Sequence, residues 1–386
     1  MKWEKVKLGD ISSNIQTGPF GSQLHQSDYS EEGIPVVMPK DLSNGRISEE
    51  SIARVDSSHV IRLSRHKIEM GDILYSRRGD VGRCAFATER EKGWLCGTGC
   101  LRVTVDTTKA NPKFVFYQLQ KAETVGWVEK HAVGATMLNL NTSILSNVPI
   151  AIPNLNKQNY IVEVLSAYDD LIENNQKQIK LLEEAAQRLY KEWFVDLRFP
   201  GYEHTPIVDG VPERWERTAV CSLLGKIART TQVATSQYST IGSIPIIDQS
   251  RDFIAGYTND LSSKVDIGKP VIVFGDHTRI LKYVQFPFAK GADGTQLIVS
   301  NDVRMPQSLF YCSLVNVDLS NYHYARHFKY LKAENILIPT KNISNMFDTF
   351  VTPIYSKIQT LRDISTKAKQ ARDRLLPKLM SGEVEV

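Results

Sequence analysis

Few residues of this chain have the spacing that a catalytic or metal site needs. His323 and His327 stand four residues apart, as zinc-binding histidines on a helix do, but Tyr324 takes the place of the glutamate in a His-Glu-x-x-His motif. Cys96 and Cys100 are separated by three residues, and the five cysteines are odd in number and lack metal-ligand spacing. We therefore expect no metal site, and we expect the cysteines to be free thiols.

Motifs for cofactor chemistry are also missing from the sequence. There is no Gly-x-x-x-x-Gly-Lys-Ser/Thr loop for a nucleotide and no Gly-x-Gly-x-x-Gly fingerprint after a strand. Asp276 and His277 could form a general base, but no activated nucleophile stands beside them in the sequence. These observations favour a binding module that has no catalytic residue and holds no cofactor of its own.

Several loops combine glycine with basic, amide or hydroxyl side chains. Arginine can bridge the O6 and N7 atoms of guanine, and glutamine or asparagine can bridge N6 and N7 of adenine. Lysine, hydroxyl groups and the N–H groups beside glycine contact phosphates. The candidate nucleic-acid contacts in the first half of the chain are Thr17, Gly18, Gly21, Ser22, Gln23, Lys40, Arg77, Arg78, Arg83, Thr136 and Asn139. Those in the second half are Arg251, His277, Thr278, Arg279, Lys290, Thr295 and Gln296.

Two long amphipathic segments are expected to hold the globular parts that contain these loops. Spacings of four and three residues place apolar side chains at nine of ten positions of the first segment, with Asn175 as the exception, and at eight of ten of the second. A sustained period of 3.5 indicates a coiled-coil seam. The first seam is Ile161, Leu165, Tyr168, Ile172, Asn175, Ile179, Leu182, Ala186, Leu189 and Trp193. The second seam is Phe347, Val351, Ile354, Ile358, Leu361, Ser365, Ala368, Arg372, Leu375 and Leu379.

The two segments are expected to pair with each other. The first is rich in acidic residues and the second in basic residues, which favours pairing between them. Because the second segment starts where the second globular part ends, pairing within the chain must be antiparallel. A helix of about 36 residues is roughly 54 Å long, more than one duplex repeat of about 34–36 Å. We expect regular helix to begin near Thr352, because of Pro353, and to loosen at Pro377. The alternative is that each helix lies on its own domain.

The chain repeats itself. The segment 33–37 resembles 243–247, and 71–74 resembles 268–272; Asn111-Pro112 and Ile152-Pro153 have counterparts near Pro306 and Pro339. The offset falls from 210 to 186 residues (243−33 and 339−153), so the second copy is a shortened form of the first. Both copies mix short apolar strands with glycine, proline and asparagine breaks, and a helical run is expected over 112–128, which indicates an α+β fold. The expected parts are a first globular domain at 1–155, a helix at 156–198, a linker at 199–215, a second domain at 216–340, and a second helix with a tail at 341–386.

Composition adds only weak constraints. The 386 residues carry a formal net charge of +4, which is low for a chain that would hold a nucleic acid alone. No apolar stretch reaches the length of a membrane span, and residues 1–5 lack the apolar core of a signal peptide. We expect a cytoplasmic protein without membrane contact.

In combination, these motifs resemble the specificity subunits of type I restriction–modification enzymes. The resemblance covers essentially the whole chain and is carried by Gly-Pro-Phe-Gly-Ser at 18–22, Arg-Gly-Asp-Val-Gly at 78–82, Trp-Phe-Val-Asp at 193–196 and the ending Leu-Leu-Pro-Lys-Leu-Met-Ser-Gly at 375–382. It implies two target-recognition domains that each read half of a gapped, bipartite site in double-stranded DNA. In the second domain, Gly275-Asp276-His277-Thr278-Arg279 replaces the Arg-Gly-Asp-Val-Gly loop.

The resemblance also implies the partners. The helices would dock two methyltransferase subunits that use S-adenosylmethionine, and restriction subunits that use ATP with Mg²⁺ could join. Among the seam residues, those expected to pack the spacer and dock subunits are Ile161, Leu165, Ile172, Ile179, Leu182, Leu189, Trp193, Ile354, Ile358, Leu361 and Leu375. The competing hypotheses are a fused or stand-alone DNA-modifying enzyme and a coiled-coil scaffold without DNA contacts.

Overall fold

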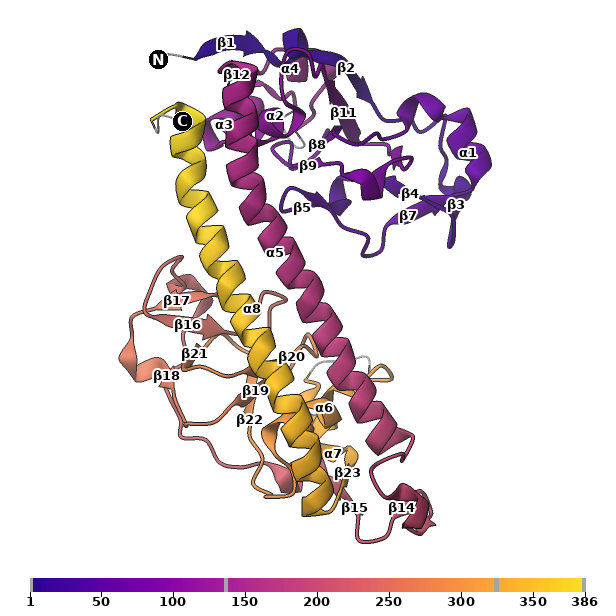
Figure 1. The fold of residues 1–386 in the computed structure, drawn as a ribbon, viewed down its shortest axis with the longest axis vertical. Coiled ribbons are helices and arrows are strands. Elements are labelled where there is room, and N and C mark those ends of the chain that lie inside the picture. The colour runs from indigo at the N-terminus through magenta and orange to yellow at the C-terminus, as the bar shows by residue number, and fades with distance from the viewer. Residues whose placement is uncertain (1–2, 135–137, 323–325, 384–386) are drawn as a thin grey trace. The chain divides into compact units, whose positions relative to one another are not determined.

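The computed structural model describes residues 3–134, 138–322 and 326–383. Two compact units share the chain. Unit 1 comprises residues 1–171 and 367–386, and unit 2 comprises residues 172–366. Each unit therefore contains a globular part and a section of both long helices, α5 (Leu155–Tyr190) and α8 (Lys341–Ser381) (Figure 1).

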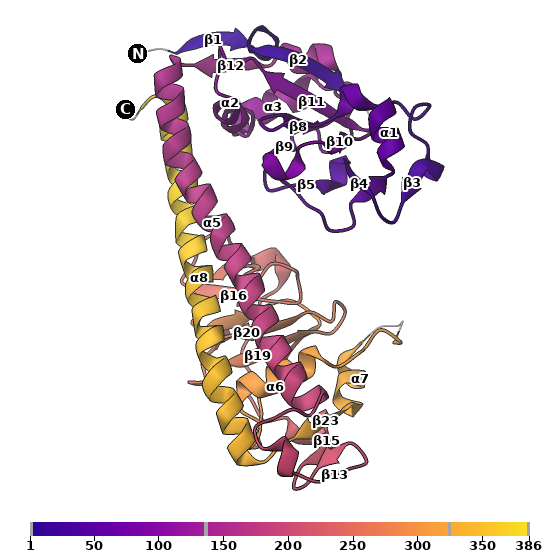
Figure 2. The same cartoon turned by 45° about the vertical axis from the view of Figure 1, so that its right-hand side comes forward.

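The globular part of unit 1 is built on small sheets. A four-stranded antiparallel sheet has the order β2-β11-β8-β9, and a second sheet has the order β10-β4-β7-β3 with β10 parallel to β4. β1 pairs antiparallel with β12, directly before α5 begins (Figure 2). The strands are β1 (Glu4–Lys7), β2 (Ser12–Thr17), β3 (Tyr29–Ser30), β4 (Ile34–Val37), β5 (Leu42–Ser43), β6 (Arg46–Ile47), β7 (Ala53–Val55), β8 (Ile73–Ser76), β9 (Cys84–Phe86), β10 (Leu95–Cys96), β11 (Cys100–Val105) and β12 (Pro149–Ile152).

Within the described residues of this part, four short α-helices accompany the sheets. They are α1 (Ser57–Arg62), α2 (Pro112–Leu119), α3 (Ala122–His131) and α4 (Thr142–Ser146). Asn111 caps α2 by accepting hydrogen bonds from the N–H groups of Lys113 and Phe114, and Pro112 takes the first turn, where a missing N–H is harmless. The helical run expected at 112–128 is thus two helices, because the chain turns at Gln120 and Lys121 before α3 begins.

Unit 2 repeats this arrangement in a shorter form. β15 (Glu216–Ala219) pairs with β23 (Asn335–Ile338) as β1 does with β12. β16 (Ile244–Ile247) lies between antiparallel β17 (Gly256–Thr258) and parallel β21 (Phe288–Lys290), as β4 lies between β7 and β10. The remaining elements are β13 (Ile207–Val208), β14 (Val211–Pro212), β18 (Lys264–Val265), β19 (Val271–Gly275), β20 (Leu281–Val284), β22 (Thr295–Ile298), α6 (Gln307–Val315) and α7 (Phe328–Ala333).

The sequence repeat is therefore a repeat of topology. The paired segments fall on β4 and β16, β8 and β19, α2 and α6, and β12 and β23. β2 has no full counterpart, since only an isolated bridge joins Leu224 to Ser300 where β2 pairs with β11 in unit 1. The shortening lies further along the chain, because the offset is still 210 residues at β4 and β16, which follow the position of β2.

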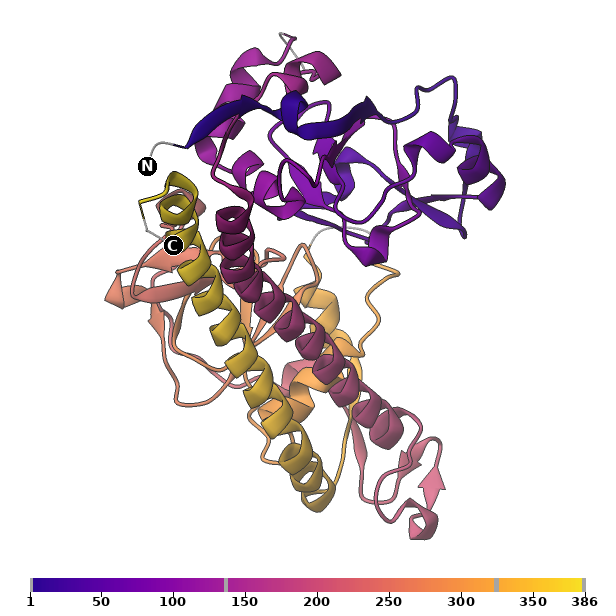
Figure 3. The same cartoon turned by 45° about the horizontal axis from the view of Figure 1, so that its top comes forward.

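The helices are antiparallel in both units. In unit 1 the beginning of α5 lies with the end of α8, and in unit 2 the end of α5 lies with the beginning of α8 (Figure 3). Every position of the two seams is buried or half-buried. In unit 2 the amide of Asn175 donates to the Ser365 hydroxyl at 3.2 Å, so the polar exception of one seam meets the serine of the other.

The second helix differs from expectation at both prolines. α8 is continuous from Lys341 through Pro353 and Pro377 to Ser381. A proline inside a helix costs about 3 kcal/mol. However, Val351 and Ile358, which lie on either side of Pro353, and Leu379, which follows Pro377, are almost fully buried in the cores of their units. Burying a large apolar side chain contributes about 1.5–3 kcal/mol, so several such contacts outweigh the missing hydrogen bond.

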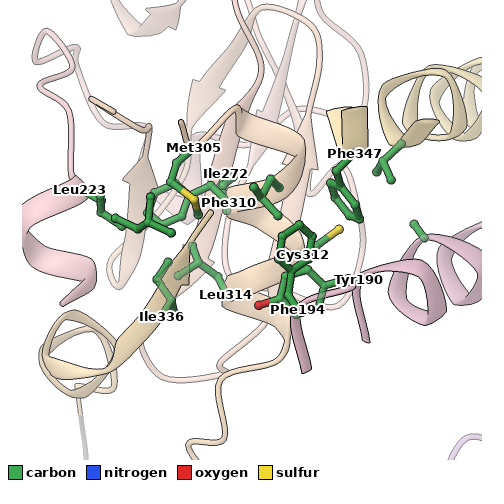
Figure 4. Close-up of a cluster of buried hydrophobic side chains, with 14 of the residues drawn as sticks. Tyr190, Phe194, Leu223, Ile272, Met305, Phe310, Cys312, Leu314, Ile336 and Phe347 are labelled. Carbon is green, nitrogen blue, oxygen red and sulfur yellow. The ribbon is translucent and has the colours of Figure 1, made fainter. Parts of the chain in front are cut away.

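The core of unit 2 joins its helices to its sheets. Tyr190 is the last residue of α5, Phe194 follows this helix, and Phe347 lies on α8. All three meet Phe310 and Cys312 of α6 in one buried cluster (Figure 4). The ring centroids of Phe194 and Phe347 are 5.1 Å apart in an edge arrangement. Because the core is shared in this way, the helix sections are part of the folded unit.

Candidate nucleic-acid interface

Three loops singled out in the sequence meet in unit 1. Thr17 ends β2, and the next N–H, that of Gly18, donates to the Cys100 carbonyl at 2.9 Å. The Arg77 N–H, at the start of the β8–β9 hairpin loop, donates to the Gly99 carbonyl at 2.8 Å. Arg78 forms a β-bridge with Asn139. The loops after β2, between β8 and β9, and before α4 therefore form one surface around residues 97–99.

The side chains of this surface differ in how available they are. Arg78, Gly21 and Ser22 are exposed, and Lys40 is exposed with its Nζ donating to the Ser51 carbonyl at 2.9 Å. Arg83 is held by Asp80, to which Nε and Nη2 donate at 3.1 and 2.8 Å. The side chain of Gln23 accepts from the Phe20 N–H at 3.2 Å and so shapes its own loop. Thr136 lies outside the described residues.

Phe20 is a member of this surface that sequence reasoning passed over. Its ring is 53% exposed although it is fully apolar, and the Arg77 guanidinium lies over it at 5.9 Å from the ring centroid. Within the described structure, Nε of Arg77 is buried without a hydrogen-bond partner. The sequence feature that could have identified it is an aromatic residue between Pro19 and Gly21, in a loop where no apolar repeat assigns it to the core.

Gly18 fixes the base of the first loop by its lack of a side chain. A Cβ atom at this position would lie 2.0 Å from the Gly97 carbonyl oxygen, whereas a Cβ at Gly21 would meet nothing within 4 Å. We expect Gly18→Ala to displace the loop and to reduce DNA binding, with a loss of stability of about 1–3 kcal/mol from overpacking. Gly21→Ala is the matched control, and it should change neither property measurably. Denaturant unfolding and binding titrations of the two variants check this, and equal behaviour of both would contradict the assigned role of Gly18.

The corresponding loops of unit 2 meet around Gln249, which was not among the candidates. Its Oε1 accepts from the His277 N–H at 3.1 Å, and its Nε2 donates to the Asp293 carbonyl at 2.8 Å. Its own carbonyl accepts from the Thr278 hydroxyl at 2.7 Å. One side chain thus joins the β16–β17 connection, the β19–β20 hairpin and the β21–β22 loop. The repeat offset of 210 aligns Gln249 with Pro39, which lies against Gly99 in the loop surface of unit 1. The repeat could therefore have indicated that Gln249 belongs to the corresponding surface of unit 2.

The other candidates of unit 2 fall into exposed and inward-facing groups. His277 and Arg251 are exposed, and Lys290 and Gln296 are half-buried. Arg279 turns inward, with Nη2 donating to the Tyr322 carbonyl at 2.7 Å and Nε donating to His327. Thr295 is 1% exposed, and its hydroxyl donates to the Ala292 carbonyl at 2.9 Å, so it supports the β21–β22 loop.

Burial lowers the pKa of two basic groups at this surface. It lowers the pKa of the Lys290 ammonium, against the attraction of Asp293. It also lowers the pKa of His327, and the Arg279 guanidinium acts in the same direction. His327 is therefore held neutral near pH 7, with Nε2 available to accept the hydrogen bond from Arg279.

Neither unit presents a metal centre in its described part. No group of three or more histidine, cysteine, aspartate or glutamate side chains is placed to hold a metal ion among the residues of known placement. Cys84, Cys96, Cys100 and Cys312 are buried free thiols, and Cys221 is an exposed one. Over the same residues, no helix is both long and apolar enough to cross a membrane.

Comparison with known proteins shows which class of protein this chain is similar to. Residues 1–184 match the family described as the type I restriction modification DNA specificity domain. The crystal structure of the type I restriction–modification S subunit from Mycoplasma genitalium has the same fold, with a TM-score of 0.61 over 98% of this chain and 96% of that one at 16% identity.

Curated relatives narrow the class. The MjaIX specificity subunit of Methanocaldococcus jannaschii is 25% identical over 413 aligned residues, covering all of this chain and 94% of the relative. The HindI specificity subunit of Haemophilus influenzae is 26% identical over 58% of this chain and 48% of its own length. The chain is therefore similar over its whole length to specificity subunits of type I restriction–modification enzymes, which confirms the resemblance seen in the sequence. Such a subunit recognises DNA and is not itself an enzyme.

Proposed function

We propose that this chain reads a bipartite, gapped site in double-stranded DNA, one half with each unit. The observation that carries the proposal is the repetition of the loop surface: the β8–β9 and β19–β20 hairpins, and the β10–β11 and β21–β22 loops, meet in the same way in two units. Two copies of one arrangement with different side chains suit two different half-sites. We propose residues 1–155 and 216–340 as the two target-recognition domains.

Direct contacts to bases are proposed for exposed and half-buried residues of these surfaces. In unit 1 these are Arg77 and Arg78 with Asn139, and Lys40 is proposed to contact phosphate. In unit 2 the proposed contacts are His277, Arg251 and Gln296. Most of the remaining candidates hold the loops in place through their backbone or through hydrogen bonds within the chain. They are Thr17, Gly18, Gln23, Arg83, Thr278, Arg279, Lys290 and Thr295. Gly21 and Ser22 are exposed at the tip of their loop, where contact with phosphate is proposed.

The helices are proposed to dock two methyltransferase subunits. The chain holds no cofactor in this proposal: S-adenosylmethionine would be bound by the methyltransferase subunits, and ATP with Mg²⁺ by restriction subunits where these join. The net charge of +4 is small for a DNA-binding protein, which suits a complex in which the partners supply part of the phosphate contacts. The proposed location is the cytoplasm, where host DNA is accessible.

A comparison of the chain alone with the reconstituted methyltransferase complex tests the proposal. We expect weak binding by the chain alone, and sequence-specific, salt-sensitive binding by the complex, in electrophoretic mobility-shift titrations at several salt concentrations. The methylated positions, found by methylation-sensitive sequencing of DNA modified by the complex, should lie in two half-sites at a constant gap. Complexes that assemble but show no sequence preference would favour the scaffold hypothesis, and methyl transfer or cleavage by the purified chain would favour the enzyme hypothesis.

A further inference from the structure

Each unit contains a carboxylate of α5 paired with an arginine of α8. In unit 1 the Asp169 carboxylate accepts from Nη1 of Arg372 at 2.7 Å. In unit 2 the Glu183 carboxylate accepts from Nη2 of Arg362 at 2.7 Å. Surface ion pairs contribute little to stability, but the Asp169 and Arg372 side chains are only 15% and 26% exposed. The unit 1 pair is therefore largely enclosed, whereas in unit 2 the Arg362 side chain is 23% exposed and that of Glu183 is 43% exposed.

The unit 1 pair also holds the globular part. The Tyr117 hydroxyl of α2 donates to the second carboxylate oxygen of Asp169 at 2.6 Å. Nη2 of Arg46 in β6 donates to the Asp169 backbone carbonyl at 3.1 Å. Tyr117 is 2% exposed, and burial together with the Asp169 charge raises its pKa, so it stays a hydroxyl donor. We name Tyr117, Asp169, Arg372 and Arg46 the Asp169 joint.

The unit 2 pair lies beside residues at equivalent places. Tyr311 of α6 matches Tyr117 under the offset of 194 that relates Pro112 to Pro306, and it lines a cavity of about 240 Å³ together with Glu183 and Arg362. Its hydroxyl donates to the Leu281 carbonyl at 3.5 Å. Phe253 lies in the β16–β17 connection, the counterpart of the β4–β7 connection that carries Arg46. The Arg362 guanidinium lies 4.0 Å from the centre of the Phe253 ring. We name Tyr311, Glu183, Arg362 and Phe253 the Glu183 joint.

The same connections lead to the proposed DNA contacts. Lys40 precedes Arg46 in the β4–β7 connection, and Arg251 precedes Phe253 in the β16–β17 connection. Lys282, which is 4% exposed, donates to the Asp252 carbonyl and so holds the second connection from the sheet side. An acidic residue, an arginine and a residue of the loop connection thus recur in both copies, although the side chain that completes the contact differs.

We propose that the two joints are positioning elements that set how each recognition domain sits on its own section of the helix pair, and so restrict the gap between half-sites that the complex accepts. The inference rests on the proposed function. Asp169→Asn and Glu183→Gln keep the shape of the side chain but remove the charge that holds arginine. In these variants each recognition domain should keep its loops and core, while its attachment to the helices is weakened.

The experiment measures binding and methylation by the reconstituted complex on duplexes that carry both half-sites at the native gap, and at gaps one base pair shorter and longer. We expect the wild type to prefer the native gap, and Asp169→Asn and Glu183→Gln to reduce that preference by about tenfold, the ratio that corresponds to 1.4 kcal/mol. Tyr117→Phe, which removes one hydroxyl, should give a smaller reduction. Asp170→Asn and Glu184→Gln are the matched controls: they remove the same charges one residue further along α5, at an exposed site and in a 3.8 Å pair with Arg188.

The outcomes separate the joints from the proposed function. If the wild type has no preferred site, the proposed function fails. If the wild type has a site and the joint variants keep its gap preference, or lose binding equally at all gaps, the joints are merely structural and the inference is overturned. If Asp169→Asn or Glu183→Gln does not assemble, Tyr117→Phe and Arg362→Lys decide between the same two outcomes, because they remove less of each joint.

Discussion

Leu182→Asp is expected to lose about 3 kcal/mol of unfolding free energy, because it places a charge without a partner against a packed apolar cluster. Leu182 lies on the α5 seam and packs against the core of unit 2 that includes Tyr190 and Phe347. Since that core is shared by both helices and the sheets, the damage should extend to the proposed docking of methyltransferase subunits. Denaturant unfolding and size-exclusion chromatography with the methyltransferase subunits measure the two effects.

The neighbouring residue is the matched control for this change. Leu181 is 64% exposed, so Leu181→Asp adds the same charge to the same turn without entering the core. We expect its unfolding free energy to stay within about 0.5 kcal/mol of the wild type, as for ordinary surface substitutions. If Leu182→Asp were as stable as Leu181→Asp and assembled normally, the seam would have been assigned to the wrong helix face.

The helix pairing could be predicted from the sequence because it depends on periodicity, which is a property of the chain itself. Ile161, Ala186 and Ile358, each chosen by spacing alone, are fully buried. The extent of α8 could not be predicted, because local propensity stops a helix at Pro353 while tertiary burial of Val351 and Ile358 carries it through. The domain repeat could also be predicted from the chain itself, because the paired segments keep their order even where their residues change.

The loop surfaces were predictable only in part. Composition identified Arg78 and His277, which are exposed, but it also selected Arg279 and Thr295, whose polar groups are used within the chain. Whether a polar side chain faces solvent depends on which loops meet, and that is decided by strand pairing far away in the sequence. Gln249 was missed for the same reason, because its three partners lie 28 to 44 residues away.

Replacing both Arg77 and Arg78 with alanine is expected to weaken binding through one half-site about a hundredfold or more, since a good arginine–base pair contributes about 1–3 kcal/mol. Fold and assembly should persist, because Arg78 is exposed and the backbone bonds of Arg77 to Gly99 and Leu140 do not involve its side chain. The loss should be confined to the half-site read by unit 1, because the loops of unit 2 are built from other strands. Binding titrations of the complex against duplexes with each half-site scrambled in turn measure this.

The reciprocal variant makes the assignment to a half-site decisive. His277→Ala should weaken recognition of the other half-site and leave the first intact, because His277 occupies the equivalent hairpin of unit 2. Lys92→Ala, in an exposed 3.4 Å pair with Glu89, serves as a charge control that should change neither half-site. If the arginine variant and the histidine variant weakened the same half-site, the two hairpins could not belong to separate readers; if neither changed the sequence preference, both would be removed from the proposed contacts. Each hairpin must therefore determine the specificity for its own half-site independently of the other. The two variants test this, one for each half-site.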